Sequence, residues 1–172
     1  MEPTEWLGGA KAQRYPLHMV SDQPYTKLHS QLDHAALSRS NKVAGREPVT
    51  LHAQDAQPRG IHAGDVVRIW NDRGACLAGA VISDQIIPGV VKLSTGAWFD
   101  PQSWGEPRVD KHGNPNALTA DIGASELSQG CAAQTCLVEI EKLEAEPPPV
   151  SAFALPQIQP LAEPREHSVL GH

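Results

Sequence analysis

The chain has 172 residues, a net charge of −6, 40% hydrophobic residues and only 5% aromatic ones. This length suits one domain with a hydrophobic core and excludes two large ones. The acidic balance excludes the electrostatic footprint of a protein that binds nucleic acid or an anionic membrane. With 15 prolines and 14 glycines, the composition favours a turn-rich β fold over a helical bundle.

Signals for membrane insertion or export are absent from the sequence. No apolar stretch approaches the roughly 20 residues that cross a bilayer, so we expect no membrane partner. The N-terminal residues lack the basic and apolar regions of a signal peptide. Cys76, Cys131 and Cys136 form an odd set without zinc-type spacing, which favours a reducing compartment. We expect a cytoplasmic location, with the periplasm as the alternative.

The predicted elements begin after an entry linker, residues 1–14. Residues 15–21 and 47–52 are the first two strand candidates. Residues 55–59 predict a short helical turn, which Gly60 ends because glycine accepts the left-handed conformation at a helix C-terminus.

The clearest local pattern is a hairpin. Residues 66–70 contain strand formers, residues 71–74 (Asn-Asp-Arg-Gly) have turn chemistry, and residues 75–82 return as the partner strand. Further strands are predicted over residues 90–93 and 136–140. Short strands at this spacing are typical of a sandwich or a closed barrel.

Two polar loops differ from ordinary scaffolding. Residues 21–31 are rich in Gln and Ser, and residues 113–134 mix Gly with Asn and Gln. Such residues suit close backbone approach and neutral hydrogen bonding to a polar heterocycle. Ordinary surface loops have similar compositions, so the pattern alone leaves that alternative open. The chain contains no Walker loop, nucleophile elbow or His-x-x-x-His pair.

Residues 15–141 also carry a series of short motifs in a fixed order. They are Tyr15-Pro-Leu-His-Met-Val-Ser, Leu28-His-Ser-Gln-Leu, Ala44-Gly-Arg-Glu-Pro, Arg59-Gly-Ile, Gly64-Asp-Val-Val-Arg, Asn71-Asp-Arg-Gly, Pro88-Gly-Val, Gly96-Ala-Trp-Phe-Asp-Pro, Asn116-Ala-Leu-Thr, Asp121-Ile-Gly and Leu127-Ser-Gln-Gly. Together they resemble the C-terminal molybdopterin-dinucleotide-binding domain of the dimethyl sulfoxide, trimethylamine N-oxide and biotin sulfoxide reductase family.

The resemblance implies a mainly β fold, a six-stranded double-psi β-barrel with short helices over residues 15–143. Residues 1–14 would then link to a preceding domain. Residues 144–172, which are rich in proline and lack hydrophobic periodicity, would form a disordered tail.

The resemblance also implies the C-terminal domain of an oxidoreductase that reduces S-oxides or N-oxides. The cofactor would be a bis(molybdopterin guanine dinucleotide) molybdenum group, shared with the preceding domains of the same enzyme. In this family the serine that ligates molybdenum belongs to an earlier domain. We therefore expect no catalytic residue and no metal ligand in this chain, and an inactive protein when the chain is alone.

The family's cofactor contacts can be carried over residue by residue. They fall on Gln23, His29, Ser30, Gln31, Asn116, Ala133 and Gln134. Gln23 departs from the pattern, because the dimethyl sulfoxide reductases carry a histidine there. The alternative function is a stand-alone double-psi barrel that binds a partner without redox activity. A relative of the aspartate decarboxylases would need a self-processing Gly-Ser site, and the chain has none.

Overall fold

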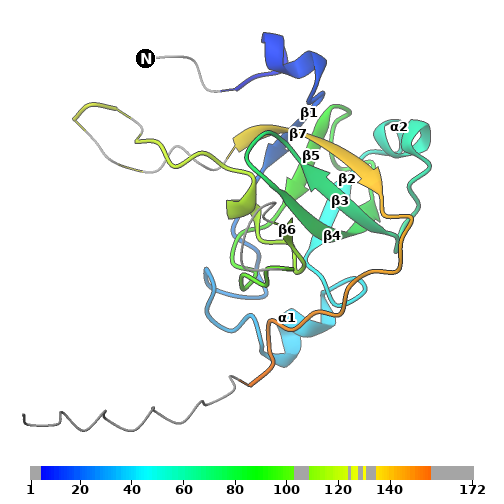
Figure 1. Cartoon of the computed structure of the whole chain (residues 1–172), viewed down its shortest axis with the longest axis vertical. Helices are drawn as coiled ribbons and strands as arrows, with labels where there is room; N and C mark the ends of the chain where they lie inside the picture. The colour runs from blue at the N-terminus through cyan, green and yellow to red at the C-terminus, as the bar shows by residue number, and fades with distance from the viewer. Residues whose placement is uncertain (1–4, 103–108, 124, 128–129, 131–134, 156–172) are drawn as a thin grey trace, which may run out of the picture.

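The computed structural model of the chain describes residues 5–102, 109–123, 125–127, 130 and 135–155. A β-barrel forms its centre (Figure 1). The strands of the described part are β1 (Leu17–Val20), β2 (Pro48–Leu51), β3 (Val66–Trp70), β4 (Ala75–Ile82), β5 (Val90–Leu93), β6 (Val109–Asp110) and β7 (Thr135–Lys142). The helices are short: α1 (Ala36–Ser40), α2 (Ala53–Ala56) and 3₁₀ turns at Ala10–Gln13, Gln57–Arg59 and Pro115–Ala117.

The strand order closes the sheet on itself. The hydrogen-bonded order is β2-β5-β1-β7-β3-β4, and β4 pairs back with β2, so six strands complete the barrel while β6 extends β4. Two of the closing pairs, β1 with β5 and β2 with β4, are parallel. Closure satisfies the backbone groups that an open sheet would leave at its edges. The predicted mainly β fold and six-stranded barrel are confirmed.

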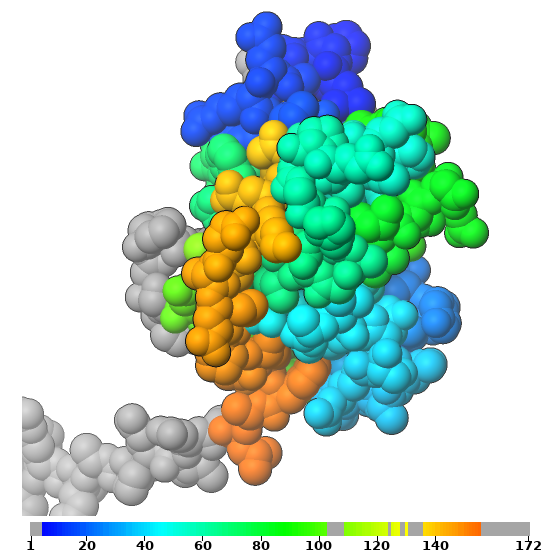
Figure 2. Space-filling model, turned by 90° about the vertical axis from the view of Figure 1, so that its right-hand side faces the viewer, coloured from blue at the N-terminus to red at the C-terminus, as the bar shows by residue number. Residues whose placement is uncertain are grey.

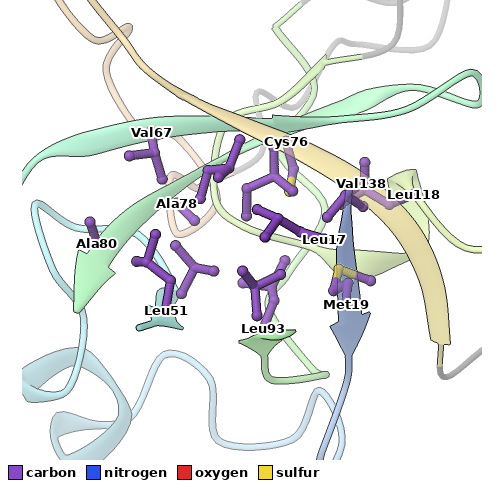
Figure 3. Packing of buried hydrophobic residues seen from close by; sticks show 14 of the residues in the cluster. Leu17, Met19, Leu51, Val67, Cys76, Ala78, Ala80, Leu93, Leu118 and Val138 are labelled. Carbon is purple, nitrogen blue, oxygen red and sulfur yellow. The ribbon is translucent and has the colours of Figure 1, made fainter. Parts of the chain in front are cut away.

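The barrel interior holds the hydrophobic core (Figure 3). Alternate strand residues point inward because successive side chains of a strand lie on opposite faces of the sheet. The inward set is Leu17, Met19, Val49, Leu51, Val67, Ile69, Cys76, Ala78, Ala80, Val91, Leu93, Cys136, Val138 and Ile140, with Leu118 added from a loop. Each fully buried Val, Leu, Ile or Met contributes about 1.5–3 kcal/mol, so this interior is the main source of stability.

Local sequence patterns predicted most strands but missed several short elements, among them α1, β6 and the 3₁₀ turns at Ala10–Gln13 and Pro115–Ala117. The hairpin of β3 and β4 and strand β5 lie where expected, and Gly60 ends the turn at Gln57–Arg59 with φ +63°. Helix α1 was missed because its one buried residue is Ser38, so no apolar stripe marks it. Strand β6 has two residues, too few for a period of two to be recognised.

Residues 5–14, part of the segment predicted to be a linker, are attached to the barrel through Glu5. The guanidinium of Arg73 donates hydrogen bonds of 2.8 and 3.0 Å to the two carboxylate oxygens of Glu5. The backbone N–H of Leu137, in β7, donates to the same carboxylate. The hydrogen bond from Arg73 lowers the pKa of Glu5 from 4.5 to about 2, although partial burial opposes the shift.

The tail also contacts the domain in its described part. Figure 2 shows residues 143–155, in orange, running along the surface toward the α1 region. The carboxylate of Asp100 accepts hydrogen bonds from the backbone N–H and the hydroxyl of Ser151, both at 2.6 Å. The rings of Phe153 and His112 meet edge to face at 5.0 Å. Ser151 and Phe153 therefore contact the domain, while the disorder expected for residues 144–172 stays a prediction, and residues 156–172 lie outside the described residues. No helix of the described residues is both long and apolar enough to span a bilayer.

Candidate functional site

Three predicted site residues lie on one tight turn, Leu28–Gln31, which we call the cradle turn. Leu28 and Gln31 exchange two backbone hydrogen bonds, of 3.3 and 2.8 Å. His29 has φ +49°, a left-handed conformation that is unfavourable for a residue with a Cβ. The side chains of His29, Ser30 and Gln31 are exposed. The turn therefore presents an imidazole, a hydroxyl and an amide at the surface, all neutral hydrogen-bonding groups when the imidazole is unprotonated.

Gln23, the fourth predicted residue, closes the loop that leads into the cradle turn. Its side-chain amide donates a hydrogen bond of 2.8 Å to the carbonyl of Lys27. On either side of it, the hydroxyls of Ser21 and Thr26 are buried and have no hydrogen-bond partner among the described residues. Buried polar groups are normally satisfied, so these hydroxyls leave bonding capacity for a polar ligand at this loop.

Beneath the cradle turn lies a closed ring of four buried charges, Lys27, Asp33, Lys42 and Glu47, which we call the charge ring. The ammonium of Lys27 lies 3.0 Å from Asp33 and 2.6 Å from Glu47, and that of Lys42 lies 2.9 Å from each. The four side chains are at most 3% exposed. Each charge faces two opposite ones, so the ring is neutral as a whole, and its buried charges are paired.

Asp33 connects the charge ring to the rest of the site. Burial raises the pKa of Asp33, but hydrogen bonds from Lys42, from the backbone N–H of Trp98 and from Lys27 outweigh it and lower the pKa from 3.8 to about 2. The bond from the Trp98 N–H is 2.9 Å long. Asp33 therefore stays ionised at neutral pH and holds the backbone of Trp98 against the ring.

The segment Gly96–Trp98 contacts the cradle turn directly. The indole N–H of Trp98 donates a hydrogen bond of 2.7 Å to the carbonyl of Ser30. Gly96 has φ +96°, and a Cβ on it would lie 1.8 Å from the carbonyl oxygen of His29. Only glycine permits this close approach in this backbone conformation.

The second polar loop is organised by Asp110. Its carboxylate accepts backbone N–H bonds of 2.7 to 3.0 Å from Asp100, His112, Gly113 and Asn114. Burial nevertheless raises the pKa of Asp110. The side chain of Asn114 then accepts a hydrogen bond from the backbone N–H of Asn116 and caps the turn at Pro115–Ala117. Asn116, the fifth predicted residue, has an exposed side chain.

The two loops meet at Trp98 and the charge ring. His112 Nδ1 lies 3.0 Å from the carbonyl oxygen of Trp98. The backbone N–H of Glu47 donates a hydrogen bond of 2.9 Å to the carbonyl of His112. The cradle turn and the base of the second loop thus share one support. The remaining predicted residues, Ala133 and Gln134, lie outside the described residues.

Sequence reasoning did not assign a role to the charge ring, Trp98 or Asp110. Lys27, Asp33 and Lys42 follow no period in the sequence, because they lie in loops and turns. Glu47 and Trp98 lie inside two of the quoted motifs, residues 44–48 and 96–101. The sequence signal that could have identified Glu47 and Trp98 was a charged or aromatic residue within a family motif.

Comparisons with known proteins match this chain to well-defined relatives. Residues 17–137 match the family model described as the molydopterin (molybdopterin) dinucleotide binding domain. The chain is 53% identical over 141 residues to a biotin sulfoxide reductase of Cereibacter sphaeroides, covering 82% of this chain and 18% of that protein. It is 54% identical over 137 residues to trimethylamine-N-oxide reductase 1 of Escherichia coli K12, covering 78% and 16%.

A third relative and a solved structure extend the match. A dimethyl sulfoxide/trimethylamine N-oxide reductase of Cereibacter sphaeroides is 45% identical over 158 residues, covering 91% of this chain and 19% of that protein. The structure of acetylene hydratase from Pelobacter acetylenicus superposes with a TM-score of 0.64 at 17% identity, covering 83% of this chain and 21% of that one, which shows a shared fold. The chain spans less than a fifth of the length of these reductases. It belongs to the molybdopterin dinucleotide binding domain family.

Proposed function

We propose that this chain is the C-terminal domain of a molybdenum oxidoreductase that reduces S-oxides or N-oxides. The observation that carries the proposal is the family match over residues 17–137, which includes both polar loops. The relatives named above are reductases of biotin sulfoxide, trimethylamine N-oxide and dimethyl sulfoxide. Their names favour this function over a stand-alone barrel without redox activity. The preceding domains of the same enzyme would be the partners.

The proposed ligand is bis(molybdopterin guanine dinucleotide) with molybdenum, held partly by this chain. When bound, the molybdenum supplies the oxygen-atom transfer, and this chain binds and orients the organic part. His29, Ser30, Gln31 and Asn116 have exposed neutral groups that suit the nitrogen and oxygen atoms of a pterin. The unpartnered hydroxyls of the first loop fit such a ligand as well.

Three further residues belong to the proposal on different grounds. Gln23 keeps its assignment as a cofactor-binding residue. Its amide N–H already donates a hydrogen bond to the backbone carbonyl of Lys27. Its amide oxygen is the group it would offer the cofactor. Ala133 and Gln134 are assigned from the family resemblance, outside the described residues.

We also propose that the enzyme works in the cytoplasm. Cys76 and Cys136 are free, buried thiols. Burial raises the pKa of both thiols, that of Cys136 to about 11, so neither is a ready nucleophile. A chain whose described cysteines are reduced suits a reducing compartment.

The experiment replaces Asn116 with Ala in the full-length enzyme and measures bound molybdenum and pterin per protein. We expect occupancy to fall and activity to fall in proportion, because losing one hydrogen bond to a buried ligand costs about 1–3 kcal/mol. Activity per bound molybdenum should stay at the level of the unmodified enzyme.

The control is Gln85→Ala, which removes an exposed amide in the turn between β4 and β5. This variant should keep full occupancy. Full occupancy with abolished activity in the Asn116 variant would place Asn116 in the chemistry instead. If neither occupancy nor activity changes, Asn116 is an ordinary surface residue with no role in cofactor binding.

A further inference from the structure

The backbone of the cradle turn adopts an unfavourable conformation that needs support from other parts of the protein. His29, inside the turn, has a φ of +49°, and Leu32, the first residue after the turn, has a φ of +65°; both values are left-handed and neither residue is glycine. This conformation strains any residue that has a Cβ, so contacts from outside the turn must compensate. Since His29, Ser30 and Gln31 have exposed side chains, the compensation comes through the backbone of the turn.

Trp98 makes the contact that supports this backbone. Its indole N–H donates 2.7 Å to the Ser30 carbonyl, at the centre of the turn. Its own backbone N–H donates to Asp33, which the charge ring holds in place. Its carbonyl lies 3.0 Å from the ring nitrogen of buried His112. The backbone of Trp98 is thus held by Asp33 and His112, while its indole N–H donates to the turn.

The described tail supports the same indole from another side. The ring of Phe153 contacts the Trp98 ring edge to face at 5.5 Å and the His112 ring at 5.0 Å. The tail is held there because Asp100 accepts hydrogen bonds from Ser151 and from the backbone N–H of Ala152. Figure 2 shows this orange segment against the blue-to-cyan region that contains α1.

We propose that Trp98 is the positioning residue of the cradle turn, that its indole N–H sets the geometry in which the turn binds the cofactor, and that Phe153 of the tail keeps the indole in place. The inference rests on the proposed cofactor role of the turn. It gives the tail, which contributes no predicted site residue, a part in cofactor retention.

The test is Trp98→Phe in the full-length enzyme, with Trp70→Phe as the matched control. Both changes keep an aromatic ring and remove an indole N–H. The indole nitrogen of Trp70 is buried and has no hydrogen-bond partner among the described residues, so its loss frees no acceptor. The measurements are the rate at which molybdenum and pterin are released from the purified enzyme, its unfolding temperature, and kcat and KM of the fraction that remains loaded.

We expect Trp98→Phe to release the cofactor about three- to tenfold faster, the effect of one partly solvated hydrogen bond. Its unfolding temperature should match that of Trp70→Phe, and kcat per bound molybdenum should be unchanged. Equal release rates in the two variants would overturn the inference. So would a faster release that merely follows a lower unfolding temperature, because this would show a general structural role.

A second variant, Phe153→Ala, keeps the test decisive if Trp98→Phe does not fold. It leaves the indole N–H in place but removes the ring that packs on it, so release should accelerate in the same direction and by less. Unchanged release in Phe153→Ala would remove the tail from the inference. If the unmodified enzyme contains neither molybdenum nor pterin, the proposed function itself fails, which is a different outcome from equal release in the variants.

Discussion

The ammonium group of Lys27 donates a hydrogen bond of 2.6 Å to a carboxylate oxygen of Glu47, and the two side chains are 0% and 2% exposed. The same oxygen accepts a bond of 2.9 Å from Lys42, so one buried carboxylate oxygen is bonded to two lysines, and Asp33 supplies the second negative charge. Such an arrangement is stable only when it is complete, because an unpaired charge in a dry interior has no water to solvate it.

Replacing Glu47 with Gln should therefore be strongly destabilising. The change keeps the shape of the side chain but leaves two buried ammonium groups facing only Asp33. We expect a loss of about 3–5 kcal/mol in the free energy of unfolding, measured by urea denaturation. The control is Glu141→Gln, which breaks an exposed pair with Arg68 and should cost less than about 1 kcal/mol. Similar losses in both variants would contradict a closed charge ring.

Stability should fall in acid because of Asp33. Its pKa is lowered from 3.8 to about 2 in the folded protein, so its stabilising contribution is present above pH 4 and is lost as the pH falls from about 4 to about 2. This contribution is at most about 2.5 kcal/mol, from the size of the shift. Urea midpoints measured between pH 5 and pH 2 should show the decline. Asp33→Asn should have a shallower decline than Glu141→Gln, and parallel curves would exclude Asp33 as a cause.

Gly96→Ala should disrupt the support of the cradle turn. The new Cβ would lie 1.8 Å from the carbonyl oxygen of His29, which is backbone and cannot swing away. Gly60→Ala is the matched control, since Gly60 has φ +63° and no atom within 4 Å of the added Cβ. We expect about 1–2 kcal/mol for Gly60→Ala, the backbone strain alone. Thermal unfolding should show a clearly larger loss for Gly96→Ala, and equal losses would mean that the turn moves freely.

Amide hydrogen exchange should reveal the attachment of the tail. The backbone N–H groups of Ser151 and Ala152 donate to Asp100 at 2.6 and 3.1 Å, so they should exchange slowly in the native chain. Asp100→Asn removes the negative acceptor and should accelerate exchange at these two positions while leaving the amides of β3 and β4 protected. Fast exchange at both positions in the unmodified chain would show that the tail is not attached.

Most of the barrel could be predicted from local sequence. The β3–β4 hairpin follows from strand formers on either side of Asn-Asp-Arg-Gly, and β5 follows from the turn before Val90. These signals are local, because strand periodicity and turn chemistry involve neighbouring residues. The two-residue strand β6 was not predicted, because it is defined by its pairing with β4, more than 30 positions earlier in the chain, and with Pro101.

The candidate site was predictable only in part. His29, Ser30, Gln31 and Asn116 came from the family motifs, and the structure places all four side chains at the surface. What holds them there was not predictable, because the contacts join residues far apart in the chain. Trp98 meets Ser30 across 68 positions.

The sequence by itself determined the β class, the position of the main strands and the family, because each depends on short motifs or on alternation within a strand. The tertiary structure alone decided that Lys27, Asp33, Lys42 and Glu47 would meet as one neutral ring, and that the tail would be held at Asp100. Barrel closure, with β2 paired to both β4 and β5, brings these segments together. The partner of a charged residue cannot be read from the sequence, because pairing depends on distances that only the folded chain sets.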